Sequence, residues 1–351
     1  MRTVHEDFEK DFKCIADKCP MTCCKGWQIV VDENSLNRYS EYSGNVPDKI
    51  NAFIDFEEGT LVQKKDLSCA FLNKNGLCDL QLADGEDMLC DTCRLYPRHV
   101  EEYEDLREWS VSLSCPEAAR MYVERTVPAS EVVTDDDSED PLSDEFEDFD
   151  YFTFDKLLQA RDVVYEIILD EHFSFAEKIG FIMDMSERLQ AEYDKEDVIG
   201  MLDVIKSFDP KTAKTFDFLK HLPVLKTLER LDDGWNEYLK YINSEAPIHE
   251  NESCIDGVSL KRYELIMDNL MHYFVYTYFL GAVYNGMIFA YAAMCMFSVA
   301  VIDYMARSKK ASLMRNLSLK EFEEIVYRYS REIEHSDDNI DALLCYFDKL
   351  V

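Results

Sequence analysis

Cysteines are concentrated in the first third of the chain. Nine of the twelve lie within residues 14–115 of 351, at Cys14, Cys19, Cys23, Cys24, Cys69, Cys78, Cys90, Cys93 and Cys115. Thiols gathered this densely require a common partner, which can be a disulfide framework, structural zinc or an iron-sulfur cluster. This region must therefore fold around whichever partner the rest of the sequence allows.

The N-terminal residues bear on the choice between disulfides and metal. Residues 1–12 are charged and lack the apolar core of a secretory signal, so we expect a cytoplasmic protein. A reducing compartment disfavours disulfides and favours metal binding or catalysis as the use of clustered cysteines. The alternative is a set of separate buried thiols, because free cysteine is among the most buried residue types.

The charge balance limits the kinds of partner. The chain carries 71 acidic and 37 basic residues, a formal net charge of -34, so nucleic acid and anionic membrane surfaces are repelled and a basic partner is attracted. Only 11 glycines occur, and neither G-x-G-x-x-G after a strand nor a P-loop sequence is present. The sequence therefore predicts neither a Rossmann nor a P-loop nucleotide site.

Short strands and turns are expected in the cysteine-rich region. Residues 69–78 predict a hairpin turned at Asn75 and Gly76, which would present a thiol from each strand. A later strand ends at Cys115, and Pro116 after it opens a helix. We therefore expect residues 1–130 to form a small mixed α/β, cysteine-rich domain that binds a metal cluster.

The remainder of the chain has helical periodicity. Residues 131–150 form an acidic run, interpreted as a linker or alternatively as an electrostatic lure for a lysine-bearing substrate. Beyond it, Ser174-x-x-Glu177 and Ser318-x-x-Glu321 are capping boxes that open helices. We expect residues 151–351 to form an all-helical C-terminal domain, which makes the protein mainly α.

A long apolar stretch lies within this helical region. Residues 279–302 contain no charged side chain, which is long enough to cross a membrane. Glycines and an asparagine interrupt the surrounding segment 273–305, and no second such segment exists, so we predict a buried central helix pair and no membrane partner. Its tyrosines are expected to pack in the core, with a pocket lining as the alternative: Tyr273, Tyr276, Tyr278 and Tyr284.

Isolated histidines and late cysteines receive a structural interpretation. The histidines are interpreted as surface or core residues: His172, His221, His249, His272 and His335. The three late cysteines are likewise expected to be structural: Cys254, Cys295 and Cys345.

Several motifs within residues 12–120 together resemble a known family. They are Phe12-Lys13-Cys14, Thr22-Cys23-Cys24-Lys25-Gly26-Trp27, Gly76-Leu77-Cys78, Cys93-x-x-Tyr96-Pro97-Arg98 and Leu113-Ser114-Cys115-Pro116-Glu117-Ala118. This combination resembles the flagellin lysine N-methylase family and, more loosely, other zinc- or iron-chelating cysteine-cluster proteins. The resemblance implies a bacterial enzyme that uses S-adenosylmethionine to methylate surface lysines of flagellin and holds a 4Fe-4S cluster.

The resemblance also indicates which residues act. At least four of its cysteines are expected to bind the metal, with 4Fe-4S favoured over zinc: Cys14, Cys19, Cys23, Cys24, Cys69, Cys78, Cys93 and Cys115. Cys90 has no counterpart in the family pattern, so its role stays open. Tyr96 and Arg98 are the catalytic candidates because they lie in the family motif, and Tyr103 or Glu117 could also assist deprotonation of the lysine.

The predicted function is protein lysine N-methyltransferase, with flagellin or another lysine-bearing protein as partner. The spacing Cys19-x3-Cys23-Cys24 does not match the C-x-x-x-C-x-x-C of radical S-adenosylmethionine enzymes, and the sequence does not locate the donor site. The alternative function is a non-enzymatic metal-binding adaptor or electron-transfer protein with a structural zinc or iron-sulfur centre.

Overall fold

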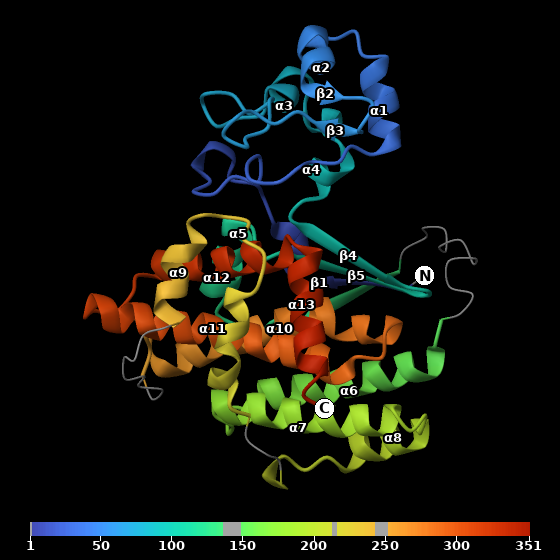
Figure 1. Ribbon diagram of the computed structural model, residues 1–351, viewed down its shortest axis with the longest axis vertical. Helices are drawn as coiled ribbons and strands as arrows, with labels where there is room; N and C mark the ends of the chain where they lie inside the picture. The colour runs from blue at the N-terminus through green and yellow to red at the C-terminus, as the bar shows by residue number, and fades with distance from the viewer. Residues whose placement is uncertain (1, 136–148, 213–215, 243–251) are drawn as a thin grey trace.

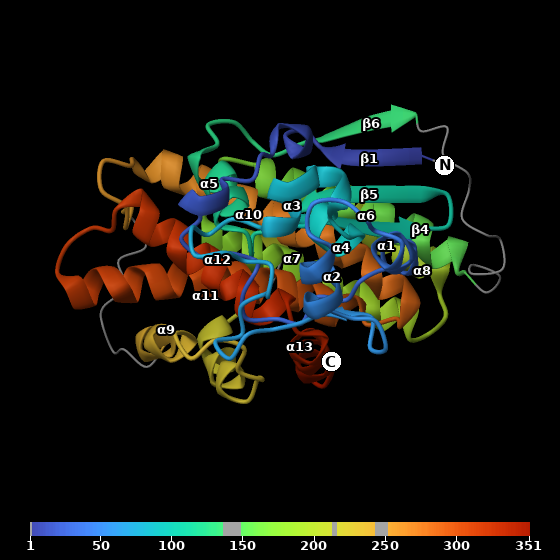
Figure 2. The same cartoon turned by 90° about the horizontal axis from the view of Figure 1, so that it is seen from above.

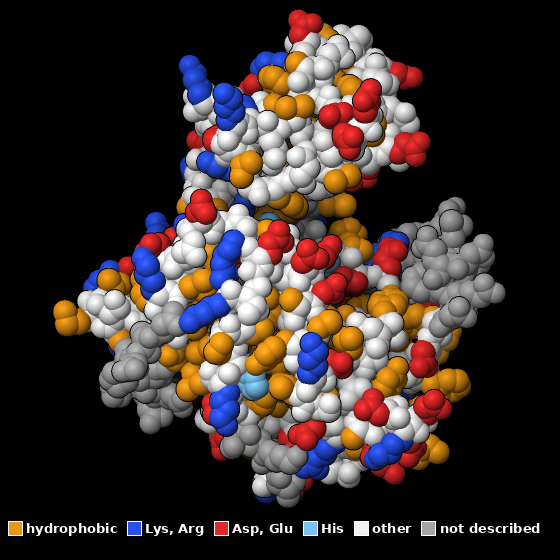
Figure 3. Space-filling model, in the orientation of Figure 1, with side chains coloured by type: hydrophobic (Ala, Val, Ile, Leu, Met, Phe, Trp, Pro, Cys, Tyr) orange, Lys and Arg blue, Asp and Glu red, His pale blue; other side chains and the backbone are white. Residues whose placement is uncertain are grey.

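The protein consists of a small lobe joined by a narrower waist to a larger helical body (Figures 1 and 3). The computed structural model describes residues 2–135, 149–212, 216–242 and 252–351. We call residues 13–95 the cysteine lobe and the remaining described residues the helical body. His249, interpreted from the sequence as a surface or core residue, and residues 136–148 of the predicted acidic linker lie outside the described residues.

The first 135 residues alternate short helices and strands. Their elements are β1 (Arg2–Glu6), η1 (Glu9–Asp11), η2 (Ala16–Lys18), α1 (Glu33–Ser40), α2 (Pro47–Phe53), β2 (Ile54–Asp55), β3 (Thr60–Leu61), α3 (Asp79–Asp84), η3 (Glu86–Met88), α4 (Asp91–Leu95), β4 (Arg98–Tyr103), β5 (Leu106–Val111), α5 (Pro116–Glu124) and β6 (Glu131–Asp135). Cys115 is the N-cap residue of α5 and Pro116 its first residue, as the sequence predicts.

From residue 149 onward, the described elements are all helices. They are α6 (Tyr151–Leu169), α7 (Phe175–Tyr193), α8 (Val198–Ser207), η5 (Pro210–Thr212), η6 (Phe218–Lys226), α9 (Trp235–Ile242), α10 (Leu260–Tyr278), η7 (Phe279–Tyr284), α11 (Ile288–Leu313), α12 (Leu319–Glu334) and α13 (Asp337–Asp348). Ser174 and Ser318 form the predicted capping boxes of α7 and α12. The protein is therefore mainly helical, as expected.

Helix α11 is the centre of the helical body. It packs against α7, α9, α10 and α13, which explains why it is apolar on all sides. Within the described residues it is the only helix long and apolar enough to cross a membrane, and 94% of its most apolar window is buried inside the protein. The predicted central helix pair is α10 and α11.

A four-stranded sheet covers one side of the body, in the order β4-β5-β1-β6 (Figure 2). Strand β1 runs parallel to β5 and antiparallel to β6, while β4 and β5 form an antiparallel pair. The guanidinium of Arg161 on α6 donates to both carboxylate oxygens of Glu108 on β5, at 2.6 and 2.7 Å. This buried ion pair joins the sheet to the helices.

The hydrophobic side chains form two separate cores. The core of the cysteine lobe contains Ile29, Val31, Tyr39, Ile50, Ile54, Leu61, Phe71, Leu80 and Met88. The core of the body runs from Val4 through β5 and α5 to Phe347, so the sheet and α5 pack with the helices. The two cores therefore separate residues 13–95 from the rest of the described chain, whereas the sequence predicts a domain of residues 1–130.

Two local predictions differ from the structure in detail. Residues 131–135 of the expected acidic linker form strand β6, because their backbone pairs with β1 along its whole length. The 69–78 segment turns at Gly76, whose φ is +76°, but only a single bridge between Leu72 and Cys78 replaces the expected strands.

Candidate functional site

Seven cysteines line one cavity of about 420 Å³ where the lobe meets the body. They are Cys14, Cys19, Cys23, Cys24, Cys78, Cys93 and Cys115. A second cavity of about 20 Å³ lies behind it and is lined by Cys24, Cys69, Cys78, Cys90 and Cys93. All eight cysteines predicted as ligands, together with Cys90, therefore gather in one region, to which the body contributes Cys115.

Two pairs of neighbouring thiols have unequal acidities. A hydrogen bond from Cys23 holds the pKa of Cys24 at about 6, and the Thr22 hydroxyl and the cation of Arg331 act in the same direction against burial. In the same way, a hydrogen bond from Cys93 lowers the pKa of Cys90 to about 7. One thiol of each pair is therefore readily ionised, which is the form that binds metal.

The other thiols are more weakly acidic because they are buried. Burial raises the pKa of Cys69 to about 11, with Cys24 and Cys78 adding to the shift. Burial likewise raises the pKa of Cys115 to about 12, with Cys19 and Cys14 adding to it. The thiols thus form two neighbourhoods, one on each side of the Cys23-Cys24 pair.

The cysteines suit a thiolate-bound metal cluster in type, number and position. Iron-sulfur clusters and structural zinc are both held by four cysteine thiolates, and more than four line this cavity. Among the described residues, however, no three His, Cys, Asp or Glu side chains stand close enough to hold a metal ion as they are. Side chains around the cavity would have to turn inward to bind one.

Arg331 connects the loop of residues 21–25, which contains Cys23 and Cys24, to the helical body. From α12 its guanidinium donates to the backbone carbonyls of Met21, at 3.4 Å, and Thr22, at 3.2 Å, and also to that of Lys25. The Trp27 indole N–H donates to the carbonyl of Cys23 within the same loop. These contacts fix the position of the Cys23-Cys24 pair relative to the C-terminal helices.

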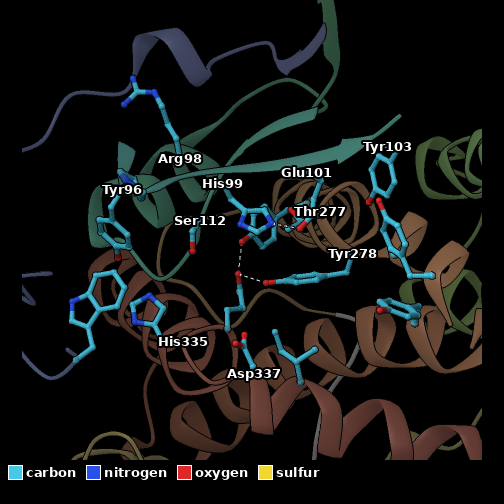
Figure 4. A pocket seen from close by; sticks show the side chains of 18 residues that line it. Tyr96, Arg98, His99, Glu101, Tyr103, Ser112, Thr277, Tyr278, His335 and Asp337 are labelled. Atoms are coloured by element: carbon cyan, nitrogen blue, oxygen red, sulfur yellow. Dashed lines mark hydrogen bonds and ion pairs between the residues drawn. The ribbon is translucent and has the colours of Figure 1, made fainter. Parts of the chain in front are cut away.

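An acidic, tyrosine-rich pocket of about 350 Å³ adjoins the cysteine cavity (Figure 4). The two share a wall made of Trp27, Tyr96, Pro97 and Arg98. The rest of the acidic pocket is lined by His99, Glu101, Tyr103, Ser112, Tyr273, Thr277, Tyr278, Gly281, Tyr284, Tyr291, Glu334, His335, Asp337 and Ile340. Its lining therefore comes from β4, the end of β5, α10, η7, α11 and the junction of α12 with α13.

Glu334 has the most unusual environment in this pocket. Its Oε2 accepts hydrogen bonds from the hydroxyls of Tyr273 and, at 2.9 Å, Tyr278. Its Oε1 is buried and, within the described residues, has no hydrogen-bond partner. Burial raises the pKa of Glu334, although the hydroxyls of Ser330, Tyr273 and Tyr278 and the charge of His99 oppose the shift.

His335 lies in the wall near the cysteine cavity. Its Nε2 lies 2.8 Å from the Ser114 hydroxyl, and its ring stacks on Trp27 with centroids 4.9 Å apart. Burial, assisted by Arg331, lowers the pKa of His335 to about 4, so the imidazole is neutral at physiological pH. Tyr96 shares the same hydroxyl, its own oxygen lying 3.0 Å from that of Ser114.

The predicted catalytic candidates are distributed around both cavities. Tyr96 and Arg98 belong to the shared wall, and Arg98 forms an ion pair with Glu9. Tyr103 lines the acidic pocket, whereas Glu117 lines the cysteine cavity and pairs with Arg120. Tyr96 and Tyr103 have raised pKa values because both are buried.

Sequence reasoning missed the C-terminal part of the site. Glu334 is the last residue of an ordinary amphipathic helix, Asp337 is the first residue of the next, and His335 was interpreted as a surface or core residue. The one available signal was the tyrosine-rich segment, where Tyr273, Tyr278 and Tyr284 line the pocket as the alternative interpretation allowed. The fourth, Tyr276, is a core residue bonded to strand carbonyls.

The comparison with protein families matches the C-terminal half of the chain. The fold and site define a helical protein with a cysteine-rich lobe and an acidic aromatic pocket beside the cysteines. A sequence profile described as the FliB lysine N-methylase C-terminal domain matches residues 161–350. The chain belongs to the FliB lysine N-methylase family, which confirms the resemblance seen in the N-terminal motifs.

Individual relatives are distant and match only part of the chain. The flagellar biosynthetic protein FliU of Salmonella muenchen is 28% identical over 123 residues, which cover 31% of this chain and 70% of that protein. The lysine-N-methylases of Salmonella choleraesuis and Salmonella typhimurium are also 28% identical over 123 residues, but the match covers only 29% of each. No solved structure matches the protein.

Proposed function

We propose that this protein is a lysine N-methyltransferase that transfers a methyl group from S-adenosylmethionine to lysines of flagellin or another lysine-bearing protein. The main support is the family match over residues 161–350, the segment that supplies Glu334, His335 and four tyrosines of the acidic pocket, Tyr273, Tyr278, Tyr284 and Tyr291. The net charge of -34 suits a basic protein partner. We also propose the cytoplasm as its compartment.

The reaction requires a neutral amine. The lysine ammonium releases its proton, the amine lone pair forms a bond to the donor methyl carbon, and the carbon–sulfur bond breaks with its electron pair left on sulfur. Methyl-lysine, S-adenosylhomocysteine and one proton result. Tyrosine walls and carboxylates suit this step, because the aromatic faces and the negative charge bind a cation and a carboxylate then accepts its proton.

The cysteine cavity is the proposed site of a 4Fe-4S cluster rather than zinc. At least four of the eight family cysteines would hold it, with Cys24 the most readily ionised among those that line the larger cavity. When bound, such a cluster supplies one-electron chemistry and a rigid link between the lobe and Cys115 of the body. The preference for iron comes from the family resemblance.

The test uses anaerobically reconstituted full-length protein, methyl-labelled donor and flagellin. We expect label on flagellin lysines, broad absorption near 400 nm, and loss of iron in Cys93→Ser but not in Cys345→Ser, whose thiol is exposed on α13. Intact, cluster-loaded protein that transfers no label would support the alternative, a metal-binding adaptor or electron-transfer protein. Stoichiometric zinc without visible absorption would overturn the iron assignment.

A further inference from the structure

The Glu334 side chain is half-buried, its Oε1 is shielded from solvent, and within the described part of the chain it forms no ion pair. Its two hydrogen bonds come from neutral tyrosine hydroxyls, both to Oε2, and Oε1 receives none. No lysine or arginine forms an ion pair with it among the described residues. Because an uncompensated buried charge is costly, such a carboxylate is suited to a cation that arrives with a ligand.

The surrounding walls are suited to the same kind of ligand. Tyr278, Tyr284, Tyr291 and Trp27 line the pocket, and aromatic faces attract ammonium groups. Asp337, in the first turn of α13, adds a carboxylate to the lining. The pocket therefore combines apolar walls for an alkyl chain with negative charge for its terminal group.

The other charged groups of the pocket are already paired. Arg98 pairs with Glu9, and His99 lies 2.7 Å from the Glu101 carboxylate. Burial disfavours the charged form of His99, but the hydrogen bond to Glu101, together with the charges of Glu101 and Glu334, outweighs it and raises the pKa of the imidazole. Glu334 and Asp337 are thus the carboxylates available to a ligand.

This charge pattern discriminates between the two cations of the proposed reaction. Besides its sulfonium and ammonium, S-adenosylmethionine carries an amino-acid carboxylate, and the pocket offers it no unpaired arginine, because Arg98 is already occupied by Glu9. A lysine side chain reaches the pocket with a single positive charge and no carboxylate. The pocket is therefore better matched to the lysine than to the donor.

We propose that this acidic pocket receives the lysine side chain of the protein substrate, with Glu334 binding the ammonium and accepting its proton. The proton passes from the lysine Nζ to the Glu334 carboxylate, which leaves the amine lone pair free for the donor methyl carbon. The raised pKa of Glu334 supports this role, because it makes the carboxylate a stronger base. The catalytic part rests on the proposed function, whereas the binding part does not.

The binding experiment uses n-butylammonium as a lysine side-chain probe and n-butanol as its neutral analogue. Saturation-transfer NMR on the full-length protein should detect n-butylammonium, with affinity at least tenfold weaker in Glu334→Gln. Glu323→Gln is the matched control, because Glu323 lies on the same helix with a raised pKa but outside the pocket. Equal binding to wild type and Glu334→Gln, or displacement of the probe by S-adenosylmethionine, would overturn the proposal.

A second variant guards against loss of structure in Glu334→Gln. Asp337→Asn leaves the tyrosine hydrogen bonds to Glu334 untouched and should weaken n-butylammonium binding severalfold with an unchanged melting temperature. Unchanged n-butylammonium affinity in this variant, together with unchanged affinity in Glu334→Gln, would contradict an acidic lysine site.

The catalytic experiment separates the two proposals. In Glu334→Gln, kcat/KM for the lysine substrate should fall about 100-fold or more, while the Kd for S-adenosylmethionine stays within twofold. Full methyl transfer by Glu334→Gln would refute proton acceptance by Glu334 but leave the methyltransferase function standing. If wild type transfers no methyl group yet binds n-butylammonium through Glu334, the proposed function fails and the cation site stands.

Discussion

The cysteine lobe and the helical body are held together by different means. The body has one continuous core that runs from β1 to α13 around the buried helix α11. The lobe has a much smaller core, two-residue strands and short helices, with nine cysteines in or beside it. Small units often need a metal or disulfides in addition to apolar burial, so the lobe is the part whose folding should depend on a bound metal.

The largest expected effect comes from removing the bound metal, which should destabilise the lobe and leave the helical body folded. Chelation of anaerobically reconstituted protein should lower hydrogen-exchange protection in residues 13–95 by about two orders of magnitude or more, since metal binding to thiolates is coupled to folding. The amides of α10 and α11 should keep their protection in the same samples. Equal protection of the lobe with and without metal would show that its apolar core suffices.

A Phe→Ala substitution in the core of each region should show whether the lobe and the body unfold separately. Phe297→Ala on α11 removes a fully buried side chain and should lower the free energy of unfolding of the body by about 4 kcal/mol. Phe71 lies in the lobe core and is 1% exposed. Phe71→Ala should therefore unfold the lobe, while the main denaturant transition of the body is unchanged. A common shift of both regions in Phe71→Ala would mean that lobe and body unfold together.

Replacing one partner of the buried ion pair between sheet and helices should destabilise the protein more than replacing both partners. Glu108→Ala leaves the Arg161 guanidinium buried without its carboxylate and should cost about 3 kcal/mol in chemical denaturation. The double variant Glu108→Leu with Arg161→Met should recover most of that loss. A double variant no more stable than Glu108→Ala would mean that the pair itself carries stability.

The smallest expected effect on the free energy of unfolding comes from a substitution at the start of α12. The hydrogen-bonded Arg315, with the Ser318 cap, lowers the pKa of Glu321 from 4.5 to about 2, so its stabilisation is present above pH 4.5 and is lost as the pH falls towards 2. Glu321→Gln keeps the capping box but loses the ion pair, and solvent screening limits the expected cost to about 0.5 kcal/mol at pH 7. Urea unfolding at pH 7 and pH 3 should show that difference shrinking in acid.

The sequence predicts the helical body better than the boundary of its lobe. Capping boxes and periodicity are local signals, so the starts of α7 and α12 were predicted correctly. The partnership of β1 with β5 and β6 joins residues more than a hundred positions apart, which no local pattern reveals. Strand β6 therefore lies in the segment expected to be a linker, and β1, β4 and β5 lie within the residues expected to form the cysteine-rich domain.

The candidate site was predictable only on its cysteine side. Repeated thiols and family motifs identify the cysteine residues one by one, whereas Glu334 and Asp337 are two acidic residues in a chain of 71. Their role depends on the meeting of α12, α13 and α10, which places Glu334 against the hydroxyls of Tyr273 and Tyr278. The ligand assignment of the cysteines stays a prediction.

Strand β1 is synthesised first but can pair with its neighbours in the sheet only after much more of the chain has been made. Residues 2–6 pair with β5 and β6, so they wait until about 130 residues have left the ribosome. At about 5–20 residues per second, that wait is on the order of ten seconds. Residues 13–95 emerge within this interval, so the lobe can fold, and take up the proposed metal, while strand β1 is still unpaired. The last cysteine of the cavity, Cys115, arrives just before the sheet closes.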